Sequence, residues 1–192
     1  MKLSLALSTL CLASVLSFSC AKSPSKPTIN AGLPSADSSV RTSTQTSLRE
    51  IWTRNIAETK ILRVSKTKVE TSTSVTLTSL IHRQGPSLIQ VFATYCPPCL
   101  REIPGFNALY ANKHSILGLS LDASNHAGLV KIMREHQPEY PVAVISNEGL
   151  DAISRNLDGL PMTLVLDTNK QVVKILYGLA DEETLRAQLK AQ

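Results

Sequence analysis

The sequence predicts an α/β fold for residues 49–192 of this 192-residue chain, with a mixed central sheet and helices on both of its faces. Two observations lead to this fold class. Apolar strand patterns alternate with helical patterns in the first part of the region, which is typical of parallel strands joined by helices. Two strand patterns then follow each other across a short turn, which adds an antiparallel pair.

The first elements follow from the spacing of their apolar residues. The segment LREIWTRNIAETKILRV is ambiguous and indicates a short helix followed by a strand. The run SLIQVFATY predicts a buried central strand, and PPCLREIPGFNALYANK has the spacing of a helix. SILGLSLD predicts a second buried strand, and Ser124 is the expected cap of a helix that ends before Pro138.

The last third of the chain predicts a short strand, a short helix, a hairpin and a final helix. YPVAVIS is the strand, and NEGLDAISRNL is a helix that opens at Asn147. MTLVLD and QVVKILYG flank TNK, which is a hairpin signal. Asp181 is the expected cap of the last helix, EETLRAQLKAQ.

Residues 1–20 have the pattern of a secretory signal peptide, in which Lys2 precedes a short apolar run. The run is shorter than the roughly 18 to 20 residues of a membrane-spanning helix; an uncleaved anchor is the alternative. Its end, VLSFSC, resembles a bacterial lipoprotein signal, in which small residues precede a cysteine that becomes acylated. Ser17 and Phe18 depart from that pattern.

The cysteine count also favours a lipid on Cys20. Cys11 leaves with the signal, and Cys96 and Cys99 form a candidate pair, so that Cys20 is left as an odd thiol. Acylation of Cys20 accounts for it. We therefore expect an exported, lipid-anchored protein in the periplasm or on the outer face of a bacterial membrane, with plain export as the alternative.

Residues 21–48 predict a flexible tether, because half of them are Ser, Thr or Pro and none is aromatic. Residues 49–192 are then one domain. The formal net charge of +5 is spread along the chain rather than gathered in a basic block, so we expect no nucleic-acid partner.

The spacing of Cys96 and Cys99 predicts thiol–disulfide chemistry, since the pair stands where a buried strand meets a helix. The reactive form of cysteine is the thiolate. Free N–H groups at a helix start stabilise negative charge, which favours Cys96 as the nucleophile. One helical turn brings Cys99 close enough to resolve a mixed disulfide, and Pro97 suits the first turn.

Two other interpretations of the cysteine pair remain open at this point. A structural zinc site needs two further ligands, and His82, His114, His126 and His136 show no suitable spacing. A purely structural disulfide is the stronger alternative, although so short a loop constrains the unfolded chain little.

The stretch QVFATYCPPCLREIP resembles the signature of thioredoxin-like proteins of the TlpA/ResA group. These are exported or membrane-tethered thiol–disulfide oxidoreductases. The resemblance covers residues 70–192, including GLPMTLVLD, and does not usefully cover residues 21–69. It implies a thioredoxin fold, with Cys96 attacking and Cys99 resolving. It implies no metal and no cofactor beyond a redox-active Cys96–Cys99 disulfide.

Four further residues match positions of that group. Glu102 matches an acid that would assist proton transfer or tune a thiol pKa; a solvated helix glutamate is the alternative. Pro104 matches a proline that kinks the helix. GLPMT resembles the loop that holds a cis-proline, which implies that Pro161 lies opposite the cysteines and that Leu160 offers backbone hydrogen bonds to an extended substrate.

Two positions depart from the group's pattern. Gln90 stands where thioredoxin has a buried aspartate and the TlpA/ResA group often has Asn, so the role of base shifts towards Glu102 or water. Tyr95 replaces the usual Trp before the first cysteine and is expected to shape the surface that binds substrate. These changes leave the chemistry intact and bear on the choice of substrate.

The resemblance implies an enzyme that reduces disulfides in exported proteins, for example during cytochrome c maturation, and that is re-reduced by a membrane electron donor. Its partners would be exported protein thiols and disulfides, with the membrane itself reached through the lipid. An oxidant or a thiol peroxidase of the same fold is an alternative. A non-enzymatic metallochaperone or binding module is another, although the CxxC spacing differs from the CxxxC of copper chaperones.

Overall fold

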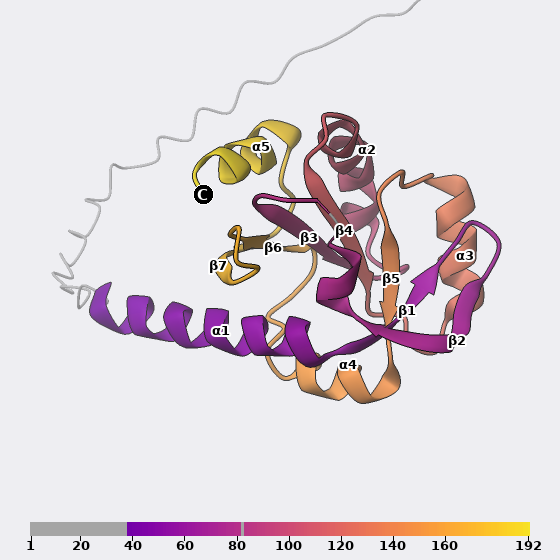
Figure 1. Ribbon diagram of the computed structural model, residues 1–192, viewed down its shortest axis with the longest axis horizontal. Helices are drawn as coiled ribbons and strands as arrows, with labels where there is room; N and C mark the ends of the chain where they lie inside the picture. The colour runs from indigo at the N-terminus through magenta and orange to yellow at the C-terminus, as the bar shows by residue number, and fades with distance from the viewer. Residues whose placement is uncertain (1–37, 82) are drawn as a thin grey trace, which may run out of the picture. The chain divides into compact units, whose positions relative to one another are not determined.

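The computed structural model of the protein describes residues 38–81 and 83–192, so the expected signal peptide, Cys20 and residues 21–37 lie outside it. The described chain forms a seven-stranded sheet with the order β2-β1-β5-β4-β3-β6-β7 (Figure 1). β3, β4 and β5 run parallel, and the other neighbours are antiparallel. The predicted mixed sheet is confirmed.

The elements are α1 (Ser38–Glu58), β1 (Lys60–Val64), β2 (Val69–Thr76), the 3-10 helix η1 (Leu77–Leu80), β3 (Ser87–Phe92), α2 (Pro97–Ala111), β4 (Ser115–Ser120), α3 (His126–Glu135), β5 (Val142–Ile145), α4 (Asn147–Ser154), β6 (Met162–Leu166), β7 (Val172–Tyr177) and α5 (Glu182–Lys190).

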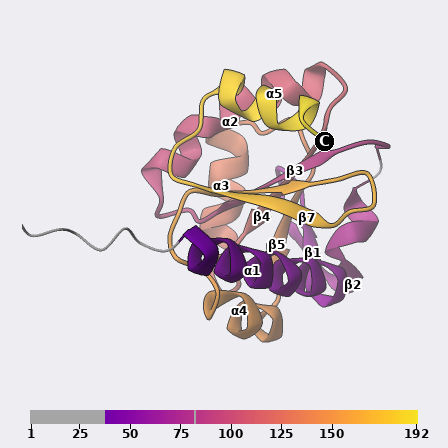
Figure 2. The same cartoon turned by 90° about the vertical axis from the view of Figure 1, so that its left-hand side faces the viewer.

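The sheet separates two hydrophobic layers, because successive side chains of a strand point to opposite faces. Ile89 and Val91 of β3 belong to the layer that contains residues of α1 and α4. Leu88 and Phe92 belong to the layer that contains residues of α2, α3 and α5. Figure 2 shows α2 and α5 on one side of the sheet and α1 and α4 on the other. Helices therefore cover both faces, as the sequence predicts.

Helix α1 begins at Ser38, so residues 38–48 of the expected tether are helical in the structure. The serines and threonines of this stretch are weak helix formers, and composition alone does not predict a helix there. Trp52 and Ile56 lie four residues apart on one face of α1, and both are fully buried in the layer under the sheet. Burial of these two side chains stabilises the helix through tertiary packing rather than through propensity.

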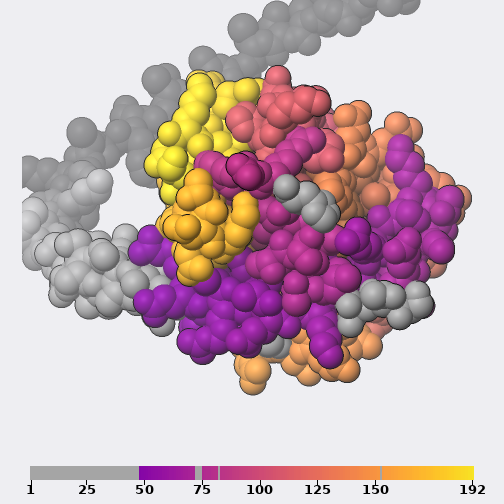
Figure 3. Space-filling view, viewed as in Figure 1, coloured from indigo at the N-terminus to yellow at the C-terminus, as the bar shows by residue number. Residues whose placement is uncertain are grey.

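Two polar contacts join α1 to β7, the edge strand of the sheet. Arg49 donates a hydrogen bond from Nη1 to the carbonyl oxygen of Val173 at 2.8 Å. The Val172 N–H donates to Oγ1 of Thr53 at 2.9 Å. The space-filling view shows α1 lying against this strand (Figure 3). Helix α1 therefore covers backbone groups that an edge strand would otherwise expose.

Helix α1 is also the longest helix of the described chain, with 21 residues. Within residues 38–81 and 83–192, no helix combines the length and the apolar character that crossing a bilayer requires.

Some local features differ from the sequence predictions. Strand β2, VETSTSVT, was not predicted; it is polar and lies at the other edge of the sheet, where the apolar signal of a central strand is absent. Asn125, not Ser124, caps α3. Both are good cap residues, so the sequence does not choose between these neighbours. Helix α4 begins at Asn147, as predicted, with Ser146 as its cap. The cap by Asp181 is confirmed.

Replacing Trp52 by Ala tests whether α1 belongs to the folded core. The variant leaves a cavity at a fully buried site, so we expect the free energy of unfolding to fall by about 3 to 5 kcal/mol. Chemical denaturation followed by circular dichroism measures this. Arg54→Ala, on the exposed face of the same helix, is the control and should change stability by less than about 0.5 kcal/mol. Equal losses in the two variants would contradict the packing of α1.

Candidate active site

The candidate site lies where β3 ends and α2 begins. Cys96 is the N-cap residue of α2, and its sulfur accepts a hydrogen bond from the Cys99 N–H at 3.3 Å. Cys96 and Cys99 form a disulfide whose Cα atoms are 5.4 Å apart. The predicted pairing of these cysteines at a helix start is therefore confirmed, and Pro97 occupies the first helical turn as expected.

The two sulfur-bearing residues differ in their access to solvent. Cys96 keeps 7% of its surface exposed, whereas Cys99 is completely buried. Tyr95, directly before Cys96, is the most exposed large hydrophobic residue of the described chain at 76%. A partner molecule can thus reach Cys96 beside an exposed aromatic ring, but it cannot reach Cys99 directly.

The loop before Cys96 is held in place by a buried acid. Asp122, which follows β4, accepts hydrogen bonds from the N–H and the hydroxyl of Thr94 at 2.8 and 2.7 Å. It also accepts one from the Ser120 hydroxyl at 2.7 Å, and Asn125 donates to the Thr94 hydroxyl. Sequence reasoning missed this contact, although the carboxyl ends of parallel strands meet at one edge of a sheet.

Glu102 is buried on α2, one turn after Cys99, with only 3% of its surface exposed. Its Oε1 accepts the Ala180 N–H at 2.8 Å, and its Oε2 accepts Nε2 of Gln90 at 3.3 Å. Burial raises the pKa of Glu102, and these two hydrogen bonds oppose the rise. The alternative of a solvated helix glutamate is wrong, because α5 and its preceding turn cover this face of α2.

Gln90 is fully buried on β3 and connects the cysteine-bearing helix to the sheet. Its Nε2 donates to the Cys99 carbonyl oxygen at 2.9 Å, and its Oε1 accepts the Tyr140 hydroxyl at 2.7 Å. Sequence reasoning singled out Gln90 but missed Tyr140 and Ala180. These contacts join residues 50 and 78 positions apart, for which local spacing carries no signal.

The loop before β6 completes the site. The Leu160–Pro161 peptide bond is cis, as the resemblance implied. Met162 pairs with Val91 in antiparallel register, which places Pro161 just beyond the end of β3, on the side that leads to Cys96. Pro161 is buried, and Leu160 is half-buried and packs against the layer that contains both cysteines. The structure therefore brings Tyr95, Leu160 and Pro161 to the same end of the sheet as the disulfide.

The turn between β7 and α5 brings the Ala180 N–H to Glu102. Gly178 has a φ of 84°, a backbone conformation that favours glycine, and its N–H donates to the Pro161 carbonyl at 2.9 Å. A Cβ atom on Gly105 would lie only 3.6 Å from Cβ of Glu182, so α2 and α5 pack closely here.

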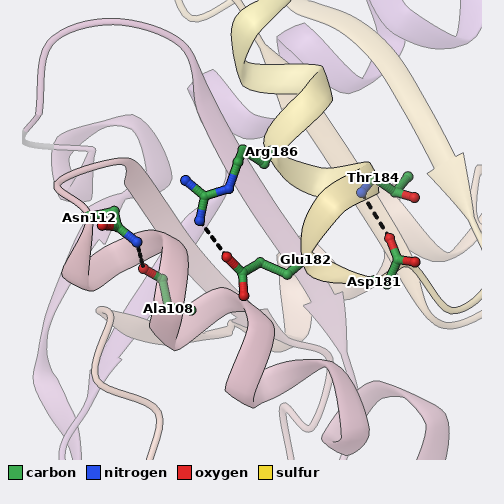
Figure 4. A network of polar contacts seen from close by, with 6 residues as sticks. All are labelled: Ala108, Asn112, Asp181, Glu182, Thr184 and Arg186. Carbon is green, nitrogen blue, oxygen red and sulfur yellow. Dashed lines mark hydrogen bonds and ion pairs between the residues drawn. The ribbon is translucent and has the colours of Figure 1, made fainter.

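Two acids at the start of α5, Asp181 and Glu182, are engaged within their own helix, as Figure 4 shows. Asp181 accepts the Thr184 N–H at 2.8 Å, and Glu182 pairs with Arg186. On the facing helix, Nδ2 of Asn112 donates to the Ala108 carbonyl near the end of α2. Asp181 and Glu182 are therefore held by groups of their own helix, whereas Glu102 is the carboxyl group that α2 buries.

Sequence comparison gives relatives of one kind. No family model matches the chain. The chain is 31% identical over 118 residues to the thiol:disulfide interchange protein DsbE of Pseudomonas fluorescens biotype C, and 27% identical over 106 residues to the thiol–disulfide oxidoreductase ResA of Bacillus cereus. These matches cover 61% and 53% of the chain. They cover 65% and 60% of the relatives, so the chain spans less than two thirds of their length.

Solved structures give the fold. A thiol:disulfide interchange protein of the thioredoxin family from Chlorobium tepidum matches with a TM-score of 0.54 at 20% identity, over 69% of this chain and 92% of that one. A secreted disulfide oxidoreductase of Mycobacterium tuberculosis matches with a TM-score of 0.55 at 11% identity, over 72% and 98%. The chain has the thioredoxin fold. The thioredoxin fold expected from the sequence is confirmed, with the Cys96–Cys99 disulfide at the start of α2.

The buried carboxyl group of this thioredoxin fold makes stability depend on pH. The pKa of Glu102 is raised above the ordinary 4.5 that the unfolded chain retains. Its contribution to stability is therefore fully present below pH 4.5 and is lost as the pH rises through the raised folded value. We expect the free energy of unfolding of the wild type, minus that of Glu102→Gln, to fall from acidic to neutral pH.

Denaturant titrations of the oxidised wild type and of Glu102→Gln, at one acidic and one neutral pH, measure this difference in the free energy of unfolding. Glu183→Gln, which replaces an exposed carboxyl group at the start of α5, controls for the loss of one charge. A difference that stays constant or grows with pH would show that burial does not raise the pKa of Glu102.

Proposed function

We propose that this protein is a thiol–disulfide oxidoreductase that reduces disulfide bonds in exported proteins. The observation that carries the proposal is the unequal access to the two cysteines of the disulfide: Cys96 keeps 7% of its surface exposed at a helix start, and Cys99 is completely buried. Similarity to proteins named DsbE and ResA supports the same reaction class.

The reaction starts from the reduced pair. The Cys96 thiolate attacks one sulfur of the substrate disulfide, that S–S bond breaks, and the departing substrate sulfur takes up a proton. The Cys99 thiolate then attacks the Cys96 sulfur of the mixed disulfide and releases the second substrate thiol. Two electrons pass from the cysteine pair to the substrate, and the Cys96–Cys99 disulfide forms. A dithiol donor in the membrane must reduce the pair again.

Glu102 is proposed to act on the second step. It lies three residues after Cys99, which places both side chains on one face of α2. A carboxylate whose pKa is raised by burial is a better base than an exposed one, because its pKa lies nearer to neutral pH. We assign to Glu102 the removal of the Cys99 proton when the mixed disulfide forms.

The substrate is proposed to lie across Tyr95, Leu160 and Pro161. Tyr95 is exposed beside Cys96, and the Leu160–Pro161 loop reaches the same end of the sheet. An extended segment of the substrate would meet the backbone of Leu160 in the manner of an added strand. The aromatic ring of Tyr95 would contact the residues that flank the substrate cysteine.

The proposed setting is the outer face of a bacterial membrane. It rests on the signal-like residues 1–20, on Cys20 as lipidation site and on the Ser/Thr/Pro-rich segment that follows. One protein of the same fold is described as an exposed lipoprotein of Streptococcus pneumoniae, at 13% identity and a TM-score of 0.54. The M. tuberculosis protein is described as secreted.

Cysteine variants test the order of attack. Because the resolving thiol is missing, reduced Cys99→Ala should accumulate mixed disulfides with substrate proteins through Cys96, visible as bands on a non-reducing gel. Cys96→Ala should accumulate none, because Cys99 is completely buried, and a variant lacking both cysteines is the control. Equal trapping by the two single variants would contradict the assignment of Cys96 as the nucleophile.

The redox equilibrium of the cysteine pair tests the direction of electron flow. A buried carboxylate one turn from Cys99 opposes negative charge on the thiolates of the reduced pair. The reduced form is therefore not strongly stabilised relative to the disulfide. We expect equilibration with glutathione to give a reducing potential. A potential of about −120 mV, which is typical of the strong oxidant DsbA, would show that the protein is an oxidant.

A further inference from the structure

Gln90 is a fully buried polar residue in the middle of β3, and its cross-strand neighbour is the buried Thr163 of β6. It lies within β3, whose residues are all buried, on the side that faces α2. Its amide makes three hydrogen bonds: Nε2 donates to the Cys99 carbonyl and to Oε2 of Glu102, and Oε1 accepts the Tyr140 hydroxyl. One buried amide thus joins the second cysteine to the buried acid and to a tyrosine from another element.

The partners determine which way the amide points. A backbone carbonyl and a carboxylate oxygen lie on one side, and both are acceptors, so this side requires the NH₂ group. The amide oxygen then faces Tyr140, whose hydroxyl must donate. Burial raises the pKa of Tyr140 far above its ordinary value, and the charge of Glu102 raises it further. The hydroxyl therefore keeps its proton and can donate.

The structure leaves a fitted space for the Tyr140 ring. The ring is 3% exposed and packs against Phe106 of α2, with centroids 5.9 Å apart. On the other side lies Gly118 of β4, where a Cβ atom would come within 3.1 Å of Cε2 of Tyr140. A glycine in the middle of a buried strand is unfavourable on its own. Its presence here makes room for the ring that brings the hydroxyl to Gln90.

We propose that Gln90 and Tyr140 are positioning residues for Glu102. The Tyr140 hydroxyl fixes the orientation of the Gln90 amide, and that amide holds the Glu102 carboxylate and the Cys99 carbonyl in their relative places. The role of the pair in turnover rests on the proposed function of Glu102, whereas the positioning itself does not. If the amide turned over, its oxygen would face the carboxylate, and the ionised form would lose a donor.

The Glu102 carboxylate accepts hydrogen bonds from the uncharged Gln90 of β3 and from the Ala180 N–H before α5, and its charge acts on Tyr140 before β5. The other titratable groups at the starts of α2 and α5, which pack against each other, are Cys96, Cys99, Asp181, Glu182 and the exposed Glu183. Asp181 and Glu182 are bound by the Thr184 N–H and by Arg186. In the disulfide form the cysteines do not titrate. The oxidised protein therefore isolates the effect of the Gln90–Tyr140 pair.

The test follows the titration of Glu102 directly, in the oxidised full chain labelled with ¹³C at glutamate side chains. The Glu102 carboxyl signal is assigned by its loss in Glu102→Gln. Tyr140→Phe keeps the ring and removes the hydroxyl that orients Gln90. We expect the Glu102 titration midpoint to move to higher pH, because the carboxylate loses a fixed donor. Gln90→Met removes that donor outright and should move the midpoint in the same direction.

A double variant separates positioning from general damage to the core. If Tyr140 acts through Gln90, the Tyr140→Phe/Gln90→Met protein should titrate like Gln90→Met alone. Tyr110→Phe is the matched control: it removes the same hydroxyl from a ring at the far end of α2, where the ring lies under Arg83, and should titrate like the wild type. A wild-type midpoint in Tyr140→Phe, or additive shifts in the double variant, would overturn the proposal.

The pH dependence of disulfide reduction then connects the pair to turnover. We expect the acidic limb of the profile to move to higher pH in Tyr140→Phe together with the Glu102 midpoint. The two claims fail separately. If the wild type reduces no disulfide, the proposed function is wrong and the titration result still stands. If the Glu102 midpoint does not move in a fully active Tyr140→Phe enzyme, the positioning proposal is wrong and the proposed function still stands.

Discussion

The backbone N–H groups at the start of α2 have no carbonyl partner within the helix, and the site is arranged around this constraint. The Cys96 sulfur accepts one of these groups, from Cys99. Prolines in the first turn have no N–H to satisfy. A sulfur atom that meets this requirement stands at the positive end of a helix, where negative charge is favoured. The nucleophile and the helix cap are therefore the same residue.

A second constraint is the need to satisfy polar groups beneath that helix. An unpaired buried carboxylate is costly, and the fold provides Glu102 with two donors, one from Gln90 and one from the Ala180 N–H. Gln90 is in turn satisfied by Tyr140 and the Cys99 carbonyl. In the described residues the buried side-chain atoms that lack a partner belong to Trp52, Asn55 and His126, outside this network. The network links α2 to both the sheet and the turn before α5.

The two layers of the core carry different tasks. The layer of α2, α3 and α5 contains the disulfide and the polar network, so residues there combine packing with chemistry. The opposite layer is anchored by Trp52 and Ile56 and covers the sheet without reaching the cysteines. Helix α1 also contacts the edge of β7, the strand from which the chain continues to Gly178 and Ala180. Support for the site thus extends to a helix on the far face.

The sequence by itself determined what local spacing controls: the central strands β3 and β4, the cysteine pair at a helix start, the hairpin of β6 and β7, and the cap by Asp181. The position of Pro161 and of the buried acid came from resemblance to a known group. Tertiary structure alone decided the contacts of Asp122 with Thr94, of Tyr140 with Gln90 and of Glu102 with Ala180, across 28, 50 and 78 residues. These depend on strand order and on which helix covers which face, and no local pattern encodes either. The helical residues 38–48 were also missed, because their Ser- and Thr-rich composition does not predict a helix.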